Sequence, residues 1–193
     1  MNTKYTIIAL MGKAGSGKDT ILHALLKQPA FKNAAPIVSC TTRPMRENEK
    51  DGIDYHFLTQ SEFTDKILSG DMLEATIFND WCYGTSLENL SKDKVNIGVF
   101  NPEGVGLLRG RDNIKLTLIY IEARDKDRLL RQLNRENDPD IHEIFRRYSA
   151  DEMDFAEEEI EYLEPDCFIT NNDGGSIKKI AGAIANAWAS GQL

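Results

Sequence analysis

Short apolar runs alternate along the chain with segments in which apolar residues recur every three or four positions. The runs of strand length are residues 5–11, 37–40, 95–100, 115–121 and 167–170, with a further short run at 55–58. The segments with helical spacing are residues 19–27, 63–68, 129–133, 141–162 and 177–188. Strands that alternate with helices predict an α/β fold, with a parallel sheet that helices cover on both faces.

A glycine-rich stretch follows the first predicted strand and leads into the first predicted helix. Gly12, Gly17 and Lys18 meet the pattern G-x-x-x-x-G-K-[ST] except at its last position. In this context backbone N–H groups curl around a phosphate, the helix N-terminus adds a positive dipole end, and Lys18 reaches the β- and γ-phosphates of a nucleotide. A tight strand-to-helix corner is the competing interpretation. We therefore expect a P-loop NTPase-type sheet whose ATP-binding residues are Gly12, Lys13, Ala14, Gly15, Ser16, Gly17, Lys18, Asp19 and Thr20.

Composition limits the class of protein. The 193-residue chain is 41% hydrophobic and has a formal net charge of −8, which suits a single globular domain and argues against a nucleic-acid partner. No apolar run reaches the roughly 18 to 20 residues of a membrane span, and residues 1–4 lead straight into a strand. We therefore expect a cytoplasmic protein with no membrane partner. The 3 cysteines and 3 histidines are scattered and form no metal-binding pattern, and no pattern indicates the oligomeric state.

Four blocks in the middle of the chain narrow the class further. They read SCTTRPMR at 39–46, GIDYHF at 52–57, GDMLE at 70–74 and YGTS at 83–86. Together with the glycine-rich loop and the closing ITNND at 169–173, they resemble the guanylate kinase family in order and spacing. The resemblance covers nearly the whole chain. It implies one domain with a core of residues 1–38 and 90–193, an inserted segment at 39–89 that binds the nucleoside monophosphate, and a lid near 134–147.

Four side chains of the inserted segment suit a dianionic phosphate. Arg43 and Arg46 provide bidentate forks that a single lysine does not offer. The hydroxyl groups of Tyr55 and Tyr83 add donors to the same phosphate. The resemblance implies the same roles, while solvated loop charges and packing tyrosines are the competing interpretations.

Glu74 is the candidate for recognition of the base. Its two acceptor oxygens match the adjacent N–H donors of guanine, a pair that adenine lacks, although a surface carboxylate is also compatible with its position. The resemblance implies the same role for Glu74. It adds Ser39 and Thr85 as contacts to the acceptor nucleotide, and Asn171 as a contact to the adenine of ATP.

Four arginines with helical spacing lie in and before the expected lid. Such a row is typical of a salt-bridged, solvent-exposed helix face. It also fits the arginine-bearing lid that the resembling family closes over the phosphates. The four are Arg124, Arg128, Arg131 and Arg135.

Two alignments of the lid stay open. Matching the family's arginines by their four-residue spacing selects Arg131 and Arg135, whereas matching the leucine pattern without a gap puts Gln132 and Glu136 at those positions. The gapless match also puts a later family arginine at Arg147, with Arg146 as the alternative. The cations that we expect to act in catalysis are Lys18, Arg43, Arg135 and Arg147.

Two departures from the family pattern concern the metal. The strand at 95–100 is followed by Asn101 and lacks the two aspartates that the family carries there, and Asp19 replaces the loop hydroxyl that normally binds magnesium. A carboxylate beside three phosphates would be repelled unless a cation lay between them. We therefore hypothesise that Asp19 holds Mg²⁺ directly or through water. In the competing interpretation Asp19 caps the helix and Thr20 serves the metal.

The sequence thus predicts ATP- and Mg²⁺-dependent phosphorylation of GMP by in-line transfer, with dGMP as a second candidate acceptor. Two alternatives stay open. Ribose 1,5-bisphosphate phosphokinases resemble the chain in a Gly-Lys-Asp loop and in an asparagine at position 101, but they are less similar in the acceptor segment. Guanylate-kinase-like modules that bind phosphorylated peptides without catalysis use the same arginines, but their phosphate loop is usually degraded.

Overall fold

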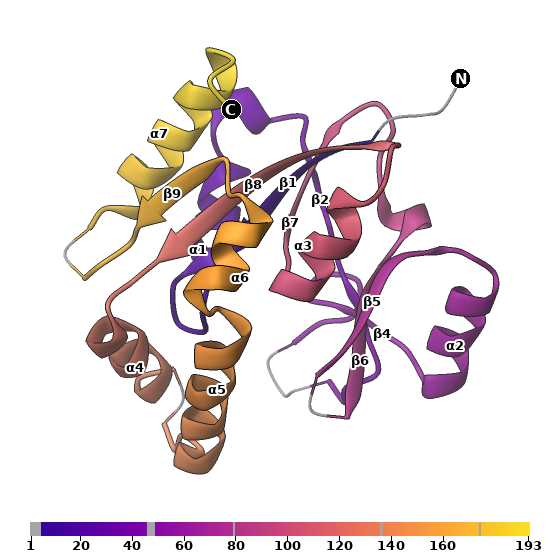
Figure 1. Ribbon diagram of the computed structural model, residues 1–193, viewed down its shortest axis with the longest axis horizontal. Coiled ribbons are helices and arrows are strands. Elements are labelled where there is room, and N and C mark those ends of the chain that lie inside the picture. The colour runs from indigo at the N-terminus through magenta and orange to yellow at the C-terminus, as the bar shows by residue number, and fades with distance from the viewer. Residues whose placement is uncertain (1–4, 46–48, 79, 136, 174) are drawn as a thin grey trace.

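The larger of two sheets is parallel and carries the glycine-rich loop at the carboxyl end of its central strand (Figure 1). The computed structural model describes residues 5–45, 49–78, 80–135, 137–173 and 175–193. The strand order of this sheet is β2-β7-β1-β8-β9. The bounds are β1 Tyr5–Met11, β2 Ala35–Pro36, β7 Val95–Val99, β8 Ile114–Glu122 and β9 Cys167–Thr170. Every pairing in it is parallel, which confirms the predicted sheet.

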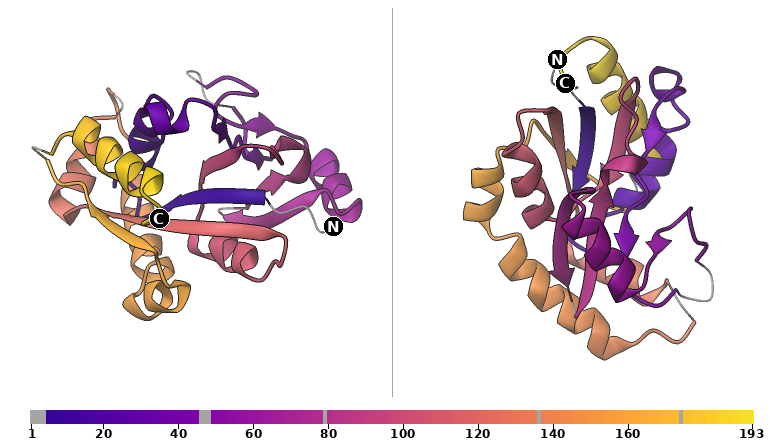
Figure 2. Two further views of the ribbon diagram at one scale, coloured as in Figure 1. Left: turned by 90° about the horizontal axis from the view of Figure 1, so that it is seen from above. Right: turned by 90° about the vertical axis from the view of Figure 1, so that its right-hand side faces the viewer.

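Helices cover both faces of this sheet because β1 is apolar on both sides (Figures 1 and 2). Ile7 and Met11 belong to one core cluster, with α3 (Pro102–Arg109) and α6 (Glu157–Leu163). Ile8 and Leu10 belong to the other, with α1 (Lys18–Leu25) and α7 (Ile177–Ala189). All four side chains are at most 1% exposed. Shortening any one of them to alanine would cost about 2 to 5 kcal/mol of stability.

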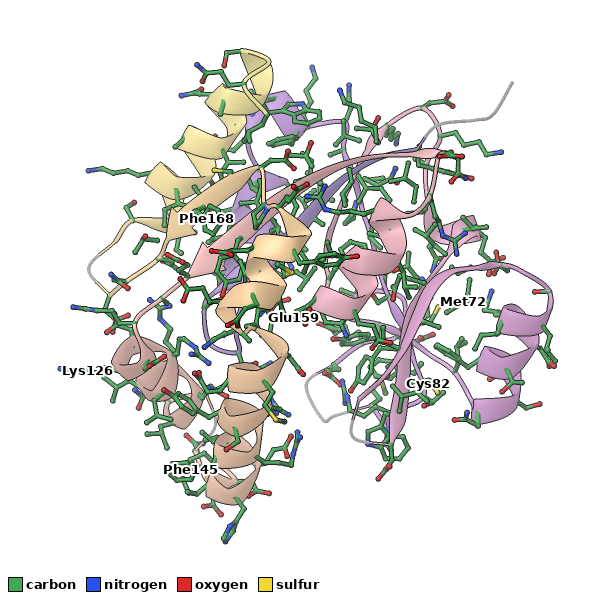
Figure 3. All side chains as sticks on the ribbon, viewed as in Figure 1. Met72, Cys82, Lys126, Phe145, Glu159 and Phe168 are labelled. Atoms are coloured by element: carbon green, nitrogen blue, oxygen red, sulfur yellow. The ribbon has the colours of Figure 1, made fainter. Side chains whose placement is uncertain are left out.

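The second sheet is smaller and lies within residues 40–86. Its strands are β3 Cys40–Thr41, β4 His56–Phe57, β5 Met72–Phe78 and β6 Trp81–Ser86, in the order β4-β3-β6-β5. Helix α2 (Gln60–Leu68) begins with a capping box between Thr59 and Glu62. Phe63 of α2 packs with Met72 and Cys82 of the sheet, and Figure 3 shows these two side chains on the strands beside α2.

The chain enters and leaves the second sheet at neighbouring points. Residues 37–40 were expected to form one strand, and this prediction was wrong. The backbone N–H of Ile37 still bonds the carbonyl of Ile97 in the large sheet at 2.8 Å, whereas the carbonyl of Ser39 already accepts from His56 in the small one at 2.9 Å. On the way back, the side chain of Asn89 donates to the carbonyl of Val38 at 3.2 Å.

Three helices form the side of the molecule that carries the expected lid. They are α4 (Asp125–Leu133), α5 (Ile141–Asp154) and α6. The single helix expected over residues 141–162 is therefore two helices, broken at Phe155. The ring of Phe155 turns inward and packs 6.2 Å from that of Tyr120, so core packing decides where the helix breaks. Two 3-10 turns, η1 (Pro29–Phe31) and η2 (Leu87–Asn89), complete the elements. None of the helices in the described part of the chain has both the length and the apolarity to cross a membrane.

Candidate active site

The phosphate loop, residues 12–20, packs tightly against the ends of three other elements. Gly12, Gly15 and Gly17 have φ values of 152°, 75° and 95°, in the region that favours glycine. A Cβ on Gly12 would lie 2.2 Å from the carbonyl oxygen of Ile121, and one on Gly17 would lie 2.4 Å from the amide nitrogen of Asn171. Only glycine fits these positions, because φ is positive and because the backbone of β8 and the side chain of Asn171 lie so close to the loop.

Lys18 begins α1 and turns its ammonium group back over the loop. Its Nζ donates to the carbonyl oxygens of Gly12 at 2.6 Å and of Lys13 at 3.1 Å. Burial lowers the pKa of Lys18, and the charges of Asp19 and Asp151 act in the opposite direction. The amine lies at the centre of the loop, within reach of a phosphate held there.

Asp19 and Thr20 are both exposed in the first turn of α1. The charge of Asp19 acts on Lys18 and also on Tyr55, whose pKa is raised first by burial and then by this carboxylate. Asp19 is therefore near enough to the phosphate loop and to the second sheet for its charge to act on a residue of each. No group of three or more His, Cys, Asp or Glu side chains suited to a metal occurs among the described residues.

Arg43 lies on an aromatic surface of the second sheet. Its guanidinium carbon is 5.5 Å from the ring centroid of Tyr55 and 5.7 Å from that of Phe57, and the ring of Tyr83 is 6.0 Å from that of Tyr55. Nη2 of Arg43 donates to the carboxylate of Glu49 at 2.8 Å. The Arg43 side chain is 11% exposed, so it is not a solvated loop charge. The structure thus brings Arg43, Tyr55 and Tyr83 together, while Arg46 lies outside the described residues.

Glu74 is buried between β5 and the N-terminus of α3. It is 7% exposed and pairs in register with the buried Thr85 of β6. Burial raises its pKa to about 7, although Thr85 beside it acts in the opposite direction. A Cβ on Gly104 would lie 3.3 Å from the carboxylate. Glu74 is therefore not a surface carboxylate, and Ser39, half-buried, immediately precedes β3 of the same sheet.

Asn101 has a structural role at the position where the family carries an aspartate. Its side-chain oxygen caps α3 by accepting from the N–H of Gly104 at 2.8 Å. Its amide nitrogen donates to the hydroxyl of Thr76 at 3.1 Å. Both ends of the amide are thus engaged, and the residue adds no charge beside Glu74.

Asn171 and Arg131 support the phosphate loop from outside. The amide nitrogen of Asn171 donates to the carbonyl of Ser16 at 2.8 Å. Arg131 donates to the carbonyls of Gly15 at 3.1 Å and Asn171 at 2.9 Å, and forms an ion pair with Asp173 at 2.9 Å. These bonds hold the loop against β9 and α4, and the adenine contact expected of Asn171 stays a prediction.

The two arginines expected in the lid lie on either side of the connection between α4 and α5. Arg135 follows α4 and is exposed. Arg147 lies on α5, where Glu143 accepts from it and from Arg146, both at 2.7 Å. The hydrogen bond from Arg146 is the largest cause of the fall in the pKa of Glu143 to about 2. No hydrogen bond joins Arg135 or Arg147 to the loop within the described residues, and Glu136 lies outside them.

Sequence reasoning missed the buried ion pair between Arg128 and Asp151. Arg128 is 1% exposed, so it belongs neither to a solvent-exposed helix face nor to an open lid. Its Nη2 donates to Asp151 of α5 at 2.6 Å. The helical spacing of the arginines suggested one shared environment, and nothing in the local sequence marks the aspartate 23 residues later, on the next helix, as a partner.

The large parallel sheet carries a glycine-rich phosphate loop after β1 (Figure 1). The second sheet brings together an arginine, two tyrosines and a buried glutamate. These two features define a P-loop phosphotransferase with a separate acceptor segment. The family model described as guanylate kinase matches residues 4–187. The chain belongs to the guanylate kinase family, as its sequence predicted, and is a kinase.

Known members of the family are similar over most of the chain. The guanylate kinase of Salinibacter ruber is 31% identical over 175 residues, which cover 86% of this chain and 88% of that protein. The guanylate kinase of Vibrio parahaemolyticus is 34% identical over 177 residues, covering 88% and 82%. The crystal structure of guanylate kinase from Anaplasma phagocytophilum aligns with all of this chain (100%) and 88% of that chain, with a TM-score of 0.66 at 23% identity. That likeness supports the fold, and none of these matches favours the sugar-phosphate kinase or the peptide-binding module.

Proposed function

We propose that the protein transfers the γ-phosphoryl group of ATP to GMP, with dGMP as a second acceptor. The observation that carries this proposal is the buried carboxylate of Glu74, in the same small sheet as Arg43 and its two tyrosines. A buried acceptor of two hydrogen bonds beside a phosphate-binding arginine matches a guanine nucleotide. Relatives that carry the name guanylate kinase support the same assignment.

On the donor side, the loop binds the phosphates of ATP through its backbone N–H groups. Lys18 exchanges the carbonyl oxygens of Gly12 and Lys13 for phosphate oxygens, which its flexible stem permits. Asn171 adds a contact to adenine. Because transfer of this kind needs little covalent chemistry from the protein, positioning and charge neutralisation supply most of the rate.

On the acceptor side, Arg43 and Arg46 bind the phosphate of GMP with Tyr55 and Tyr83. The guanidinium of Arg43 is already fixed over two rings and by Glu49, so little side-chain entropy is lost on binding. Ionised Glu74 accepts from the guanine N–H pair, and two further contacts come from Ser39 and Thr85.

Asp19 and Thr20 fit a magnesium ion in their donor chemistry. Both present exposed oxygens at the start of α1, and the charge of Asp19 acts on both Lys18 and Tyr55. Mg²⁺ is usually bound through one or two carboxylates together with water and substrate phosphates, so two protein ligands suffice. The ion would neutralise phosphate charge. Asp19 would hold it in place of the missing sheet aspartates.

Closure of the acceptor segment, residues 39–89, and of the lid, residues 134–147, excludes water from the reacting phosphates. Arg135 and Arg147 reach the phosphates in that closed state, after Glu143 releases Arg147. We further propose a cytoplasmic location, which the free thiols of Cys40, Cys82 and Cys167 support.

A coupled assay of ADP release tests the proposed acceptor. ATP and Mg²⁺ are offered with GMP, dGMP, AMP, UMP, CMP or ribose 1,5-bisphosphate in parallel. We expect turnover with GMP and dGMP alone. Turnover with the sugar bisphosphate alone would instead make the chain a sugar-phosphate kinase, and no turnover with any of the six would support the binding module.

A further inference from the structure

Arg128 joins three parts of the molecule through one buried guanidinium group. Nε donates to the carbonyl oxygen of Ala14 in the phosphate loop at 3.0 Å. Nη1 donates to Asp125 at the start of its own helix, at 2.8 Å, and Nη2 donates to Asp151 of α5 at 2.6 Å. The group also lies 5.1 Å from the ring centroid of Tyr148. All three nitrogens are engaged, so the orientation of the side chain is fixed.

Asp151 bonds the other backbone group of Ala14. Its Oδ2 accepts from the backbone N–H of Ala14 at 2.8 Å, and the same oxygen accepts from Arg128. The N–H and the C=O of Ala14 are therefore both bonded by one ion pair. A loop residue whose two backbone groups are fixed in this way has little freedom to rotate.

The clamp formed by Arg128 and Asp151 links the phosphate loop to α4 and α5, the helices on either side of the connection at the start of the expected lid. The backbone of Arg128 also abuts the loop, because a Cβ on Gly15 would lie 2.6 Å from its carbonyl oxygen. On α5, Asp151 lies four residues after Arg147, so the two side chains share one face of the helix. An exposed ion pair between Lys13 and Glu152, at 2.6 Å, adds a second contact between the loop and α5. Figure 1 shows α5 continuing from the lid connection to α6.

If the ion pair of Arg128 and Asp151 only stabilised the fold, it would not need to bond the backbone of the phosphate loop. Well-packed apolar side chains usually stabilise a core as well as a buried ion pair does, because they carry no desolvation cost. Here the ion pair is directed at the backbone of the loop, and its carboxylate is near enough to Lys18 for their charges to interact. The bonds that it makes therefore determine the shape of the loop and its distance from α5.

We propose that Arg128 and Asp151 are positioning residues for the donor nucleotide. They fix Ala14 relative to α5 and so set the affinity of the loop for ATP and the reach of Arg147. Neither touches the substrate in this proposal. It rests on the proposed function only in that the loop must bind a nucleoside triphosphate, whatever the acceptor is.

The test is a calorimetric titration with a non-hydrolysable ATP analogue and Mg²⁺, which needs no acceptor. For Asp151→Ala we expect the dissociation constant to rise about tenfold, as when one hydrogen-bonded contact is lost. Asp151→Asn keeps an oxygen that accepts from the N–H of Ala14, so its affinity for the analogue should fall clearly less than that of Asp151→Ala. Asp154→Asn, on the same helix but exposed, is the matched control and should bind like the wild type. In steady state the KM for ATP should rise, while the KM for GMP stays within about twofold.

A double variant, Arg128→Met with Asp151→Leu, separates positioning from folding. It replaces the ion pair by apolar side chains that fill the same space and make no bond to Ala14. Compared with Asp151→Ala, we expect the melting temperature to return toward that of the wild type while the affinity for ATP stays low. Recovery of ATP affinity together with the melting temperature would overturn the proposal. An unchanged ATP affinity in folded Asp151→Ala would do so as well. If the wild type binds the analogue but does not phosphorylate GMP, the proposed acceptor fails, and the titration still decides the role of the clamp.

Discussion

The ammonium group of Lys18 donates a hydrogen bond to the carbonyl oxygen of Gly12, 2.6 Å away at the other end of the phosphate loop. The side chain therefore connects the two ends of the loop by a hydrogen bond, in addition to making the phosphate contact proposed for it. These two roles predict two separate effects of removing it.

Lys18→Ala should lower kcat at least 100-fold, because one preorganised charge beside the transferred group is lost. The loss of the bond to Gly12 should also reduce the free energy of unfolding by about 1 kcal/mol. A coupled kinase assay and urea denaturation measure the two effects. Lys27→Ala, an exposed lysine just beyond α1, is the control and should change neither.

Arg43→Lys should raise the KM for GMP at least tenfold, although the charge is kept. Arg43 lies over two aromatic rings and binds Glu49 through a planar fork, which an ammonium group does not reproduce. The KM for ATP should stay within about twofold. Arg109→Lys is the matched control, because Arg109 bonds the carbonyl of Glu164 after α6 and not a residue of the acceptor segment. Equal KM values for GMP in the variant and the wild type would show that Arg43 does not bind the phosphate of GMP.

Glu74→Gln should raise the KM for GMP roughly 10- to 100-fold, because an amide presents a donor where guanine also has one. The pKa of about 7 adds a pH dependence. Only the ionised carboxylate accepts both bonds, so the KM of the wild type for GMP should fall as the pH rises from 6 to 8. The variant should show no such trend, and the KM for ATP is the internal reference. A flat profile for the wild type would contradict the role given to Glu74.

Glu74 should also make stability depend on pH. Because burial raises its pKa from 4.5 to about 7, the folded protein binds a proton that the unfolded chain has lost between these values. The contribution of Glu74 to the free energy of unfolding therefore falls as the pH rises through this window. We therefore compare the free energy of unfolding of Glu74→Gln with that of the wild type at two pH values. The difference between them should be more favourable to the variant at pH 8 than at pH 4.5, on the order of 2 to 3 kcal/mol. Urea denaturation at both pH values measures this, and a constant difference would mean that the carboxylate is ionised throughout.

Asp19→Ser should raise the Mg²⁺ concentration for half-maximal activity by roughly fivefold, because a carboxylate ligand is replaced by a hydroxyl. Thr20→Val tests the competing interpretation, in which Thr20 serves the metal. The other half of that interpretation was wrong, because the N-cap of α1 is Gly17 without a side-chain bond and Asp19 lies inside the first turn. Magnesium titrations of both variants at saturating ATP and GMP distinguish the two. If only Thr20→Val changes the requirement, the metal belongs to Thr20.

The large sheet and its loop could be predicted because their signals are local. The apolar run of β1, the glycines and Lys18 are contiguous, and each loop glycine has a positive φ and a closely packed neighbour. The burial of Glu74, in contrast, depends on α3 packing over its strand, and no strand was expected at 72–78. Sequence motifs identified Glu74 as a candidate, but not the change in its pKa.

The parts that could not be predicted depend on contacts between distant residues. The ion pair of Arg128 joins two residues that are 23 positions apart, and Arg128 also bonds a loop residue 114 positions away. The break at Phe155 follows from its ring packing on Tyr120, which overrides a continuous helical pattern. Helical spacing alone describes one element at a time, so it contains neither relationship.

The hydrogen bond between Asn89 and Val38 means that the acceptor segment begins and ends at adjacent points. The two ends of the 39–89 stretch thus meet at one place on the large sheet, while side chains in its middle also bond the core, as Thr76 does with Asn101. A replacement of different length would keep the order of strands in the large sheet, but it would have to restore these side-chain contacts. Single substitutions inside the segment are therefore a shorter route to a new acceptor than exchange of the whole segment.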